Sequence, residues 1–323
     1  MKKLLGAIVF LLAGPVWAEP VTITLEPVAL HKTDETITRV GKLTHVAGYQ
    51  LKADPAAFGG WSGMALRDDG KAFIAVSDGG TILRVRVDEH EPGKIIALGD
   101  GFIEPLYNDK GKRLKGKRTE DAEGIIDLSG GGLWGPFLVS FERDDRILKY
   151  EKYGSAGHLV FTPPASVTIP ENDGMEAIVQ LEDNLFLLST EKAKDENGHI
   201  VGWLWDGTNP PRQLALKQNG RHWPTEYARL PNGDVLVLER DWNPLQGLSI
   251  SFRRIARDTI KPGAVLDGEH LATMNGNHFH MDNMEGLGVR VTKDGRTLVY
   301  VLSDDNFNRK GQRTLLQIFE LQE

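Results

Sequence analysis

Five segments of one kind recur along the chain at nearly fixed intervals. Each begins with a small or acidic pair, continues through an apolar run and ends with an acidic residue. The segments are Ser62-Gly63 to Asp78, Glu123-Gly124 to Glu142, Glu176-Ala177 to Glu191, Glu226-Tyr227 to Glu239 and Glu285-Gly286 to Asp304. Their first residues lie 61, 53, 50 and 59 positions apart. A repeat of this kind predicts an array of similar supersecondary units.

The acidic ends of these repeats predict a ring of carboxylates. If each segment runs up one strand and back down the next, its first and last residues meet at one end of a hairpin. Nine of the ten end positions are Asp or Glu. Arranged around one axis, the five hairpins would bring these carboxylates together at one end of the molecule.

Short runs rich in β-branched and aromatic residues indicate an all-β protein. Turn signals such as Asp69-Gly70, Asn232-Gly233 and Asp294-Gly295 separate the runs. After the closing acid, every repeat continues into a third strand and most into a weaker fourth, for example Lys94–Ala97 and Ala165–Ile169. Four strands in each repeat are typical of a β-propeller blade.

The two ends of the chain are expected to close the ring. The last repeat stops after its third strand, and the strand-like segment Thr36–Lys52 would supply the missing outer strand. Five repeats are visible, and the insertion Asp88–Thr119 with the N-terminal segment would make most of a sixth. We therefore predict a propeller of five or six blades. The alternative, a β-sandwich, accounts for the strands but not for the period.

The first eighteen residues have the pattern of a secretory signal peptide. Lys2 and Lys3 precede the apolar stretch Leu4–Ala13, and Val16-Trp17-Ala18 offers small residues for cleavage. The apolar stretch is too short to span a membrane, and an uncleaved anchor is the alternative. We expect a periplasmic or secreted protein, cleaved after Ala18, whose residues 19–323 form a single propeller domain.

Composition narrows the classes of function. The chain has no cysteine, which excludes disulfides, thiolate metal sites, a cysteine nucleophile and a lipoprotein anchor. Its formal charge is −7, and loss of Lys2 and Lys3 makes it −9, so nucleic acid is a poor partner and a cation a good one. The basic stretch Lys110–Arg118 is interpreted as a solvated loop. We expect a monomer that binds a small anionic substrate or ligand, with a protein partner left open.

Four stretches carry a resemblance to a known family. They are Trp61-Ser62-Gly63-Met64-Ala65, Asp121-Ala122-Glu123-Gly124-Ile125, Asn283-Met284-Glu285-Gly286-Leu287 and Ser303-Asp304-Asp305-Asn306-Phe307-Asn308. From about Gly41 to Leu321 the chain resembles the phytase-like, or "esterase-like activity of phytase", proteins of bacteria. The resemblance implies a propeller and kinship with calcium-dependent phytases, which hydrolyse phosphate monoesters with metals at the channel mouth. The Asp-rich, Pro-containing signatures of those phytases are absent here, so phytate itself is not implied.

Crowded carboxylates repel one another unless cations neutralise them or protons stay bound. Oxygen ligands suit a hard divalent cation, and we expect Ca²⁺, with Mg²⁺ or Mn²⁺ as alternatives. Asn306 and Asn308 would complete the ligand shell. The alternative is that each acid caps its own hairpin or pairs with a nearby cation. The predicted metal ligands are Asp78, Glu123, Glu142, Glu176, Glu191, Glu226, Glu239, Glu285, Asp304 and Asp305.

Three closing acids are followed at once by Arg143, Lys192 and Arg240. These cations are expected to hold the oxygens of an anionic substrate, and simple charge balance is the alternative. His280, which shares a strand face with His278, is a candidate for proton transfer, unless it belongs to a polar loop. The chain has no Gly-x-Ser-x-Gly motif, so an esterase of the α/β-hydrolase type is not expected.

Together these features predict an exported, metal-dependent phosphoesterase or related ester hydrolase with its site at the acidic mouth. One alternative is a non-catalytic periplasmic propeller that binds a ligand or protein and holds a structural calcium ion. Another is a lactonase-type propeller, in which one central ion activates a sugar-acid lactone. Metal analysis beside a panel of phosphomonoesters and lactones distinguishes the three.

Overall fold

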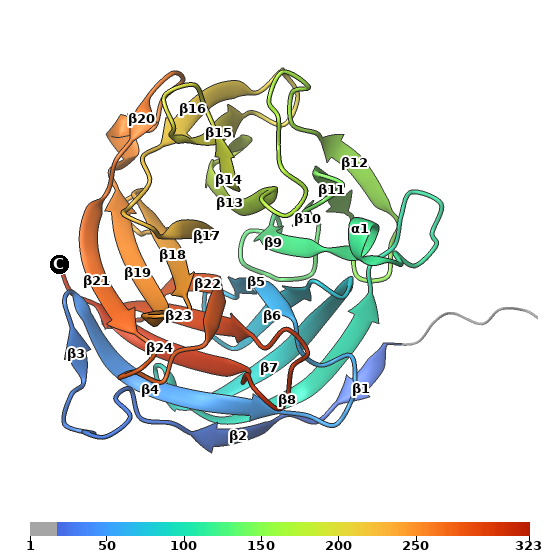
Figure 1. Cartoon of the computed structure of the whole chain (residues 1–323). Helices are drawn as coiled ribbons and strands as arrows, with labels where there is room; N and C mark the ends of the chain where they lie inside the picture. Colours follow the sequence, from blue (N-terminus) through green and yellow to red (C-terminus); the bar gives the residue numbers. More distant parts are fainter. Residues whose placement is uncertain (1–17) are drawn as a thin grey trace, which may run out of the picture.

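The computed structural model describes residues 18–323, which form five antiparallel sheets around a common axis (Figure 1). The innermost strands of the sheets are β5, β9, β13, β17 and β22, and they face one another at the centre. The chain is therefore an all-β propeller with five blades, as the repeats predicted. The signal-peptide prediction concerns residues 1–17 and the position after them, and residues 1–17 lie outside the described part.

The first three blades, followed from the inner strand outward, contain four or five strands each. Blade 1 comprises β5 (Trp61–Leu66), β6 (Ala72–Ser77), β7 (Thr81–Glu91), β8 (Lys94–Pro105) and β1 (Glu19–Val21). Blade 2 comprises β9 (Ala122–Asp127), β10 (Phe137–Phe141), β11 (Arg146–Tyr150) and β12 (Gly157–Phe161). Blade 3 comprises β13 (Met175–Glu182), β14 (Leu185–Lys194), β15 (Ile200–Trp205), β16 (Arg212–Leu216) and the parallel β20 (Val265–Leu266).

Blade 4 comprises β17 (Trp223–Arg229), β18 (Val235–Asn243), β19 (Gly247–Ile255) and β21 (Glu269–Asn275). Blade 5 comprises β22 (Asn283–Val291), β23 (Thr297–Asp304), β24 (Leu315–Leu321), β4 (Leu43–Lys52) and β2 (Thr24–Pro27), with β3 (Arg39–Val40) paired to β4. Two short helical segments complete the described chain, α1 (Lys117–Glu120) and the 3-10 turn Arg257–Thr259. Neither of them is long or apolar enough to cross a membrane.

Two predictions about outer strands need correction. The insertion Asp88–Thr119 does not build a sixth blade, because residues up to Pro105 lengthen β7 and β8 within blade 1 and the remainder is loop and α1. The fourth strand of blade 2 is Gly157–Phe161, whereas the predicted strand Ala165–Ile169 lies in turn and loop. Both errors concern outer strands, which pack on fewer neighbours and carry a weaker apolar pattern.

The ring closes through the two ends of the chain, as expected. β4 pairs with β24 in a register that runs from Leu43 opposite Leu321 to Gln50 opposite Leu315. Figure 1 shows the blue β4 beside the red β24 in one sheet. Closure pairs the outer edge of β24 and leaves no unfilled blade.

The hydrophobic core is divided into five clusters, one between each pair of neighbouring blades. Successive side chains of a strand point to opposite faces, so a strand between two blades must be apolar on both faces. In β18, Val235 and Val237 pack toward blade 3, while Leu236 and Leu238 pack toward blade 5. This explains the continuous apolar runs in the sequence.

The inner strands approach one another closely just below one end of the channel. A Cβ atom added to Gly63 of β5 would lie 2.4 Å from the carbonyl oxygen of Glu123 of β9. Only glycine allows this approach, because every other side chain would collide with the neighbouring backbone. This close approach of the inner strands holds the residues at their first positions close around the central axis.

Ring closure generates the first prediction. Leu43 is fully buried where β4 joins blade 5, whereas Leu245 is 95% exposed in the β18–β19 hairpin. We expect Leu43→Ala to lower the free energy of unfolding by about 2–5 kcal/mol, since it leaves a cavity in the core. Leu245→Ala, the matched control, should change it by less than about 0.5 kcal/mol. Urea denaturation measures both, and equal effects would contradict a closed ring.

Candidate metal centre at the channel mouth

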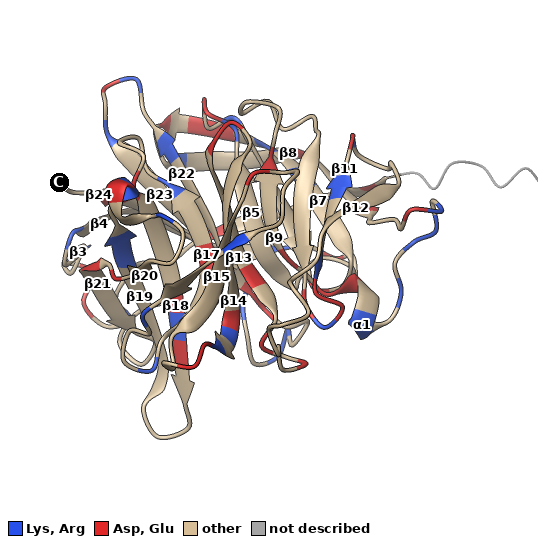
Figure 2. Ribbon diagram, turned by 90° about the horizontal axis from the view of Figure 1, so that it is seen from above, with Lys and Arg blue, Asp and Glu red and all other residues tan. Residues whose placement is uncertain are grey.

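A cavity of about 270 Å³ lies at the end of the channel where the inner strands begin and the second strands end. α1 and the charged ends of β14 and β18 lie on this face of the molecule, the lower one in Figure 2. Eight carboxylates and four cationic side chains line the cavity, which gives a formal charge of −4 if all are ionised. These side chains are Asp78, Asp121, Glu123, Glu142, Glu176, Glu191, Glu285, Asp304, Lys117, Arg143, Lys192 and Arg240.

The register of the inner hairpins explains why these side chains meet. In every blade the pairing of the first two strands shifts by one residue where the inner strand begins. In blade 1, Trp61 pairs with Ser77 and Gly63 with Val76, which leaves Ser62 as the extra residue. Such a β-bulge re-aims the side chain of the unpaired residue. The equivalent bulge positions in the five blades are Ser62, Glu123, Glu176, Thr225 and Glu285.

The register also identifies the equivalent positions on the second strands. Near the end of each second strand, one residue pairs with the residue just before the bulge on the inner strand, as Thr190 pairs with Met175 and Ser303 with Met284. The next residue then faces the mouth. These positions are Asp78, Glu142, Glu191, Arg240 and Asp304. Seven of the ten positions in the two sets are acidic, and blade 4 has no acid at either of its two.

In blade 4 the strand pairing differs by one residue from the alignment of the five sequence repeats. Glu226 is equivalent to the Gly or Ala that follows the bulge residue in the other blades. Glu239 is equivalent to the residue that precedes the cavity-facing residue of each second strand. A slip of one residue sends a side chain to the opposite face of a strand. Thr225 and Arg240 therefore take the places that were assigned to Glu226 and Glu239.

Glu226 and Glu239 have other partners. The Oε1 atom of Glu226 accepts backbone N–H groups of Ile178 at 3.3 Å and Tyr227 at 2.9 Å. Glu239 is fully buried and accepts a hydrogen bond at 2.9 Å from Nε of Arg253, which is itself buried. Neither carboxylate lines the cavity, so both are removed from the candidate site.

Asp305 and His280 also lie outside the cavity. Asp305 accepts hydrogen bonds from the backbone of Gly60 and Phe307 and from the Thr314 hydroxyl, at 3.0–3.1 Å, so it ties two loops together. His280 lies beside Arg313, and burial and that charge lower the pKa of His280. The proton-transfer role predicted for His280 at this site is therefore not supported by its place.

Two charged residues of the cavity were missed in the sequence. Asp121 precedes Glu123 by two positions, and the alternation of side chains along a strand would have placed both on one side. Lys117, on α1, lies 2.5 Å from both Asp78 and Asp121. It belongs to the basic stretch interpreted as a loop, and no local pattern singles it out.

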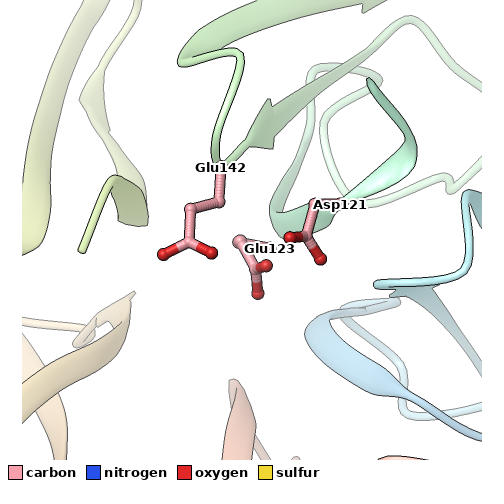
Figure 3. Close-up of side chains that lie close together, drawn as sticks. All are labelled: Asp121, Glu123 and Glu142. Atoms are coloured by element: carbon pink, nitrogen blue, oxygen red, sulfur yellow. The ribbon is translucent and has the colours of Figure 1, made fainter. Parts of the chain in front are cut away.

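Blade 2 brings three carboxylates together (Figure 3). One carboxylate oxygen from each of Asp121, Glu123 and Glu142 lies within 4.8 Å of the other two, and all three residues are buried. Asp121 pairs with Nε of Arg143 at 2.6 Å, and Glu142 accepts the backbone N–H of Gly174 at 3.2 Å. The carboxylate of Glu123 has no hydrogen-bond or ion-pair partner within residues 18–323.

Glu176, the next bulge residue around the ring, also has a buried carboxylate without a partner within residues 18–323. It is 5% exposed, and its carboxylate has no partner among the described side chains and backbone groups. A buried charge without a partner is costly. The oxygen-only donor set of Asp121, Glu123 and Glu142, with the unpartnered Glu176 in the same cavity, fits a hard divalent cation such as Ca²⁺, Mg²⁺ or Mn²⁺.

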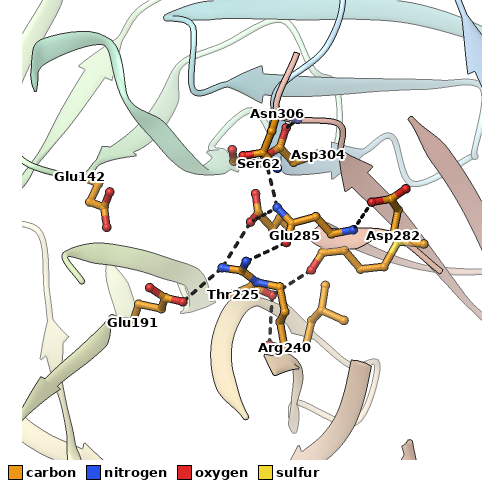
Figure 4. A network of polar contacts seen from close by, with 12 residues as sticks. Ser62, Glu142, Glu191, Thr225, Arg240, Asp282, Glu285, Asp304 and Asn306 are labelled. Atoms are coloured by element: carbon orange, nitrogen blue, oxygen red, sulfur yellow. Dashed lines mark hydrogen bonds and ion pairs between the residues drawn. The ribbon is translucent and has the colours of Figure 1, made fainter. Parts of the chain in front are cut away.

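The wall opposite blade 2 is built on Arg240 (Figure 4). Its terminal nitrogens donate to Oδ1 of Asn283 at 2.7 Å and to Oε1 of Glu191 at 3.2 Å, and lie 3.6 Å from Glu285. Asn283 in turn donates to Glu285 and Asp304. The Nε atom of Arg240 is buried and has no partner in the described chain. One guanidinium thus pairs with Glu191 of blade 3 and Glu285 of blade 5.

Burial and mutual repulsion disfavour ionisation around the ring. Burial, reinforced by neighbouring carboxylates, raises the pKa of Glu123, Glu176 and Glu285 well above the ordinary range. Burial likewise raises the pKa of Glu142 and that of Asp304 to about 7. Part of the ring therefore holds protons at neutral pH unless a metal cation replaces them.

Comparison with known proteins is consistent with the sequence resemblance. A family described as "Phytase-like: Esterase-like activity of phytase" matches residues 56–307. The chain belongs to the phytase-like family. The matched segment of this phytase-like protein contains every residue that lines the cavity. A search of curated protein sequences found no match.

Several solved structures are similar to this phytase-like protein at low sequence identity. A gluconolactonase of Xanthomonas campestris is 14% identical, with a TM-score of 0.48 over 94% of this chain and 97% of that one. A protein of unknown function from Dyadobacter fermentans is 12% identical, with a TM-score of 0.46 over 94% and 95%. The β-propeller domain of Cps50 (Swd1) from Myceliophteria thermophila is 8% identical, with a TM-score of 0.43 over 92% and 98%.

The raised pKa values generate a prediction for protein freed of divalent cations. We expect the free energy of unfolding to fall as the pH rises from about 4.5 to about 7. In that window native Glu142 and Asp304 retain protons that the unfolded chain has released, so deprotonation favours unfolding. Urea titrations with a chelator present measure the slope. In Glu142→Gln the decline should be smaller, and an unchanged slope in that variant would contradict the assignment.

The correction in blade 4 is also testable. Glu239→Gln removes the buried carboxylate that pairs with Arg253 and leaves that guanidinium only the exposed Asp267, 3.6 Å away, so it should lower the free energy of unfolding by about 3–5 kcal/mol. The exposed pair of Glu269 and Arg254 supplies the control, since Glu269→Gln should cost less than about 1 kcal/mol. Calcium affinity, measured by calorimetry, should be unchanged in both variants. A loss of affinity in Glu239→Gln alone would return Glu239 to the site.

Proposed function

We propose that this phytase-like protein is an exported, divalent-cation-dependent hydrolase of small anionic esters, with phosphate monoesters as the first substrate class. The observation that carries the proposal is the pair of buried, unpartnered carboxylates of Glu123 and Glu176 beside Asp121 and Glu142 in one cavity. A purely structural ring would satisfy its buried acids with backbone donors or cations, as Arg253 does at Glu239.

Asp121, Glu123 and Glu142 would hold the cation, with Glu176 next to them. Ca²⁺ is the expected ion, and Mg²⁺ or Mn²⁺ suit the same donors. A bound divalent cation polarises an ester oxygen and lowers the pKa of a water molecule. The cavity residues supply the remaining steps.

Three cations of the cavity would bind the anionic group of the substrate. Arg143 uses only Nε in its pair with Asp121, so its two terminal nitrogens have no partner within the described residues. Lys192 and Arg240 lie on the walls of blades 3 and 4 and share Glu191. A phosphate or carboxylate group between them would replace contacts to Glu191 with charge-assisted hydrogen bonds of similar strength.

Glu176 is the candidate for moving a proton. Burial and its carboxylate neighbours raise its pKa well above the ordinary range, which favours the protonated form. A protonated carboxyl group in a cavity can give that proton to the leaving oxygen. A cavity of about 270 Å³ takes the anionic head of an ester and leaves a larger alcohol part outside.

The proposal includes export. The N-terminal residues Lys2 and Lys3, the apolar stretch Leu4–Ala13 and the small residues before Glu19 support a cleaved signal peptide. Calcium is abundant outside the cytoplasm, where weak carboxylate sites suffice to bind it.

The test combines metal binding with hydrolysis. Purified protein should bind Ca²⁺, Mg²⁺ or Mn²⁺ in calorimetry and hydrolyse p-nitrophenyl phosphate, and a chelator should abolish turnover. Glu123→Gln should weaken metal binding at least about tenfold, because it removes a charged ligand. Glu151→Gln, an exposed acid of the same blade, is the control and should change neither.

The result also separates the rival functions. Metal binding that raises the melting temperature without hydrolysis of any ester would indicate a binding propeller with a structural ion. Hydrolysis of lactones and not of phosphomonoesters would indicate a lactonase. Absence of metal binding by the cation-free protein would overturn the proposal.

A further inference from the structure

A second cavity, of about 280 Å³, lies between blades 1 and 2 near the hairpin turns, away from the acidic mouth. Its chief lining residues are Arg67, Lys71, Arg84, Arg86, Phe102 and Trp134, and we call it the Arg84 pocket. It shares no lining residue with the mouth cavity. Four cations and one acid, Asp100, line it, whereas the protein as a whole is acidic.

Arg84 of β7 is held by aromatic rings instead of carboxylates. Its guanidinium carbon lies 5.3 Å from the ring centre of Phe102, 5.7 Å from that of Trp134 and 4.8 Å from that of Tyr153. Phe102 is its cross-strand neighbour on β8, and the other two rings come from blade 2. Cation–π contacts of this kind hold the guanidinium by its faces and leave its N–H edges free.

Arg84 has no direct polar partner in the described part of the chain, although Glu104 lies near enough that the charge of Arg84 opposes the burial-driven rise in the pKa of Glu104. Within residues 18–323 it forms no ion pair and donates no hydrogen bond, whereas Arg67 pairs with Asp69 and Arg86 with Asp88 and Asp100. The only acid of the pocket is thus already used by Arg86. A planar guanidinium with free edges matches a carboxylate or phosphate group through two parallel hydrogen bonds.

Trp134 gives the pocket an exposed ring platform. It is 65% exposed, although the loop that carries it is well fixed. The neighbouring Leu133 is buried, its N–H donates to Asp127 at 3.1 Å, and its carbonyl accepts the Tyr153 hydroxyl at 2.6 Å. A large indole held open in this way offers its face to a flat or cyclic group.

We propose that the Arg84 pocket binds a small cyclic anion, a ring that carries a carboxylate or phosphate group. The ring lies against Trp134 and Phe102, and the anionic group accepts hydrogen bonds from Arg84, with Lys71 adding positive charge. An aromatic acid and a sugar acid share this chemistry. The site is independent of the metal centre and of the proposed hydrolysis.

Calorimetry with benzoate, glucuronate and acetate tests the proposal on the full-length mature protein. Benzoate or glucuronate should bind, and the ringless acetate should bind at least about tenfold more weakly, because it lacks the stacking surface. Tighter binding of benzoate assigns the pocket to aromatic acids, and tighter binding of glucuronate assigns it to sugar acids.

Four variants locate the binding. Arg84→Gln should lower the affinity at least about tenfold, since it removes the charged donors. Arg84 also joins two blades, so Trp134→Ala, on an exposed side chain, is the second variant and should lower the affinity about three- to tenfold. Trp242→Ala is its matched control, because Trp242 is also 65% exposed but lies in the β18–β19 hairpin. Glu123→Gln should leave binding unchanged.

Three results would overturn the assignment. The first would be that neither ring acid binds more tightly than acetate. The second would be that Trp134→Ala and Trp242→Ala have equal effects on the affinity. The third would be that Glu123→Gln abolishes binding. The last result would place the anion at the channel mouth instead. Because the readout is binding, a failure of the ester assay leaves this conclusion intact.

Discussion

Repulsion between buried carboxylates is the constraint on which the chemistry of this protein depends. Four of the five β-bulges aim side chains into a mouth of about 270 Å³, and three of those four side chains are acidic. The core between the blades holds the strands so firmly that these acids cannot move apart. Cations or protons must therefore compensate them, and the protein supplies only half the necessary positive charge itself.

That compensation is uneven around the ring. Arg240 pairs with Glu191 of blade 3 and Glu285 of blade 5, and Lys117 and Arg143 share Asp121 in blade 2. Glu123 and Glu176 lie between these charged groups and have no partner among the described residues. Blade 4 contributes to this imbalance, because Arg240 occupies a position that is acidic in the other four blades and pairs with Glu191 and Glu285. A ring with strict fivefold repetition would have no preferred place for an additional cation.

The sequence was sufficient to predict the architecture and most of the mouth. The regular spacing of the repeats, the apolar runs and the strand-like Thr36–Lys52 predicted the propeller and its closure, because these features depend on local pattern and repeat. The inner hairpin of blade 4 was misaligned, because Glu226-Tyr227 resembles the Glu-Gly pairs of other blades, whereas Thr225-Glu226 occupies their place in the structure. Only the pairing of Pro224 with Glu239 reveals the displacement.

Contacts between distant segments were beyond the reach of a single sequence. Nothing near Glu239 signals that Arg253 neutralises it, and nothing near Asp305 signals that it ties the Gly60 loop to the loop before β24. Likewise, the sequence around Arg84 predicts only a strand residue, and its contacts with the rings of Trp134 and Tyr153 appear only in the structure. Such roles arise from tertiary proximity, whereas the bulge acids could be recognised because the same solution recurs from blade to blade.

The shared fifth blade has a consequence for the order of assembly. β4 is synthesised among the first strands, but its partner β24 among the last, so the final sheet must wait until nearly the whole polypeptide exists. Until then β4 presents unpaired backbone groups that invite association with other chains. A polypeptide that crosses a membrane unfolded and folds only after release would avoid that waiting period, since both strands then become available together.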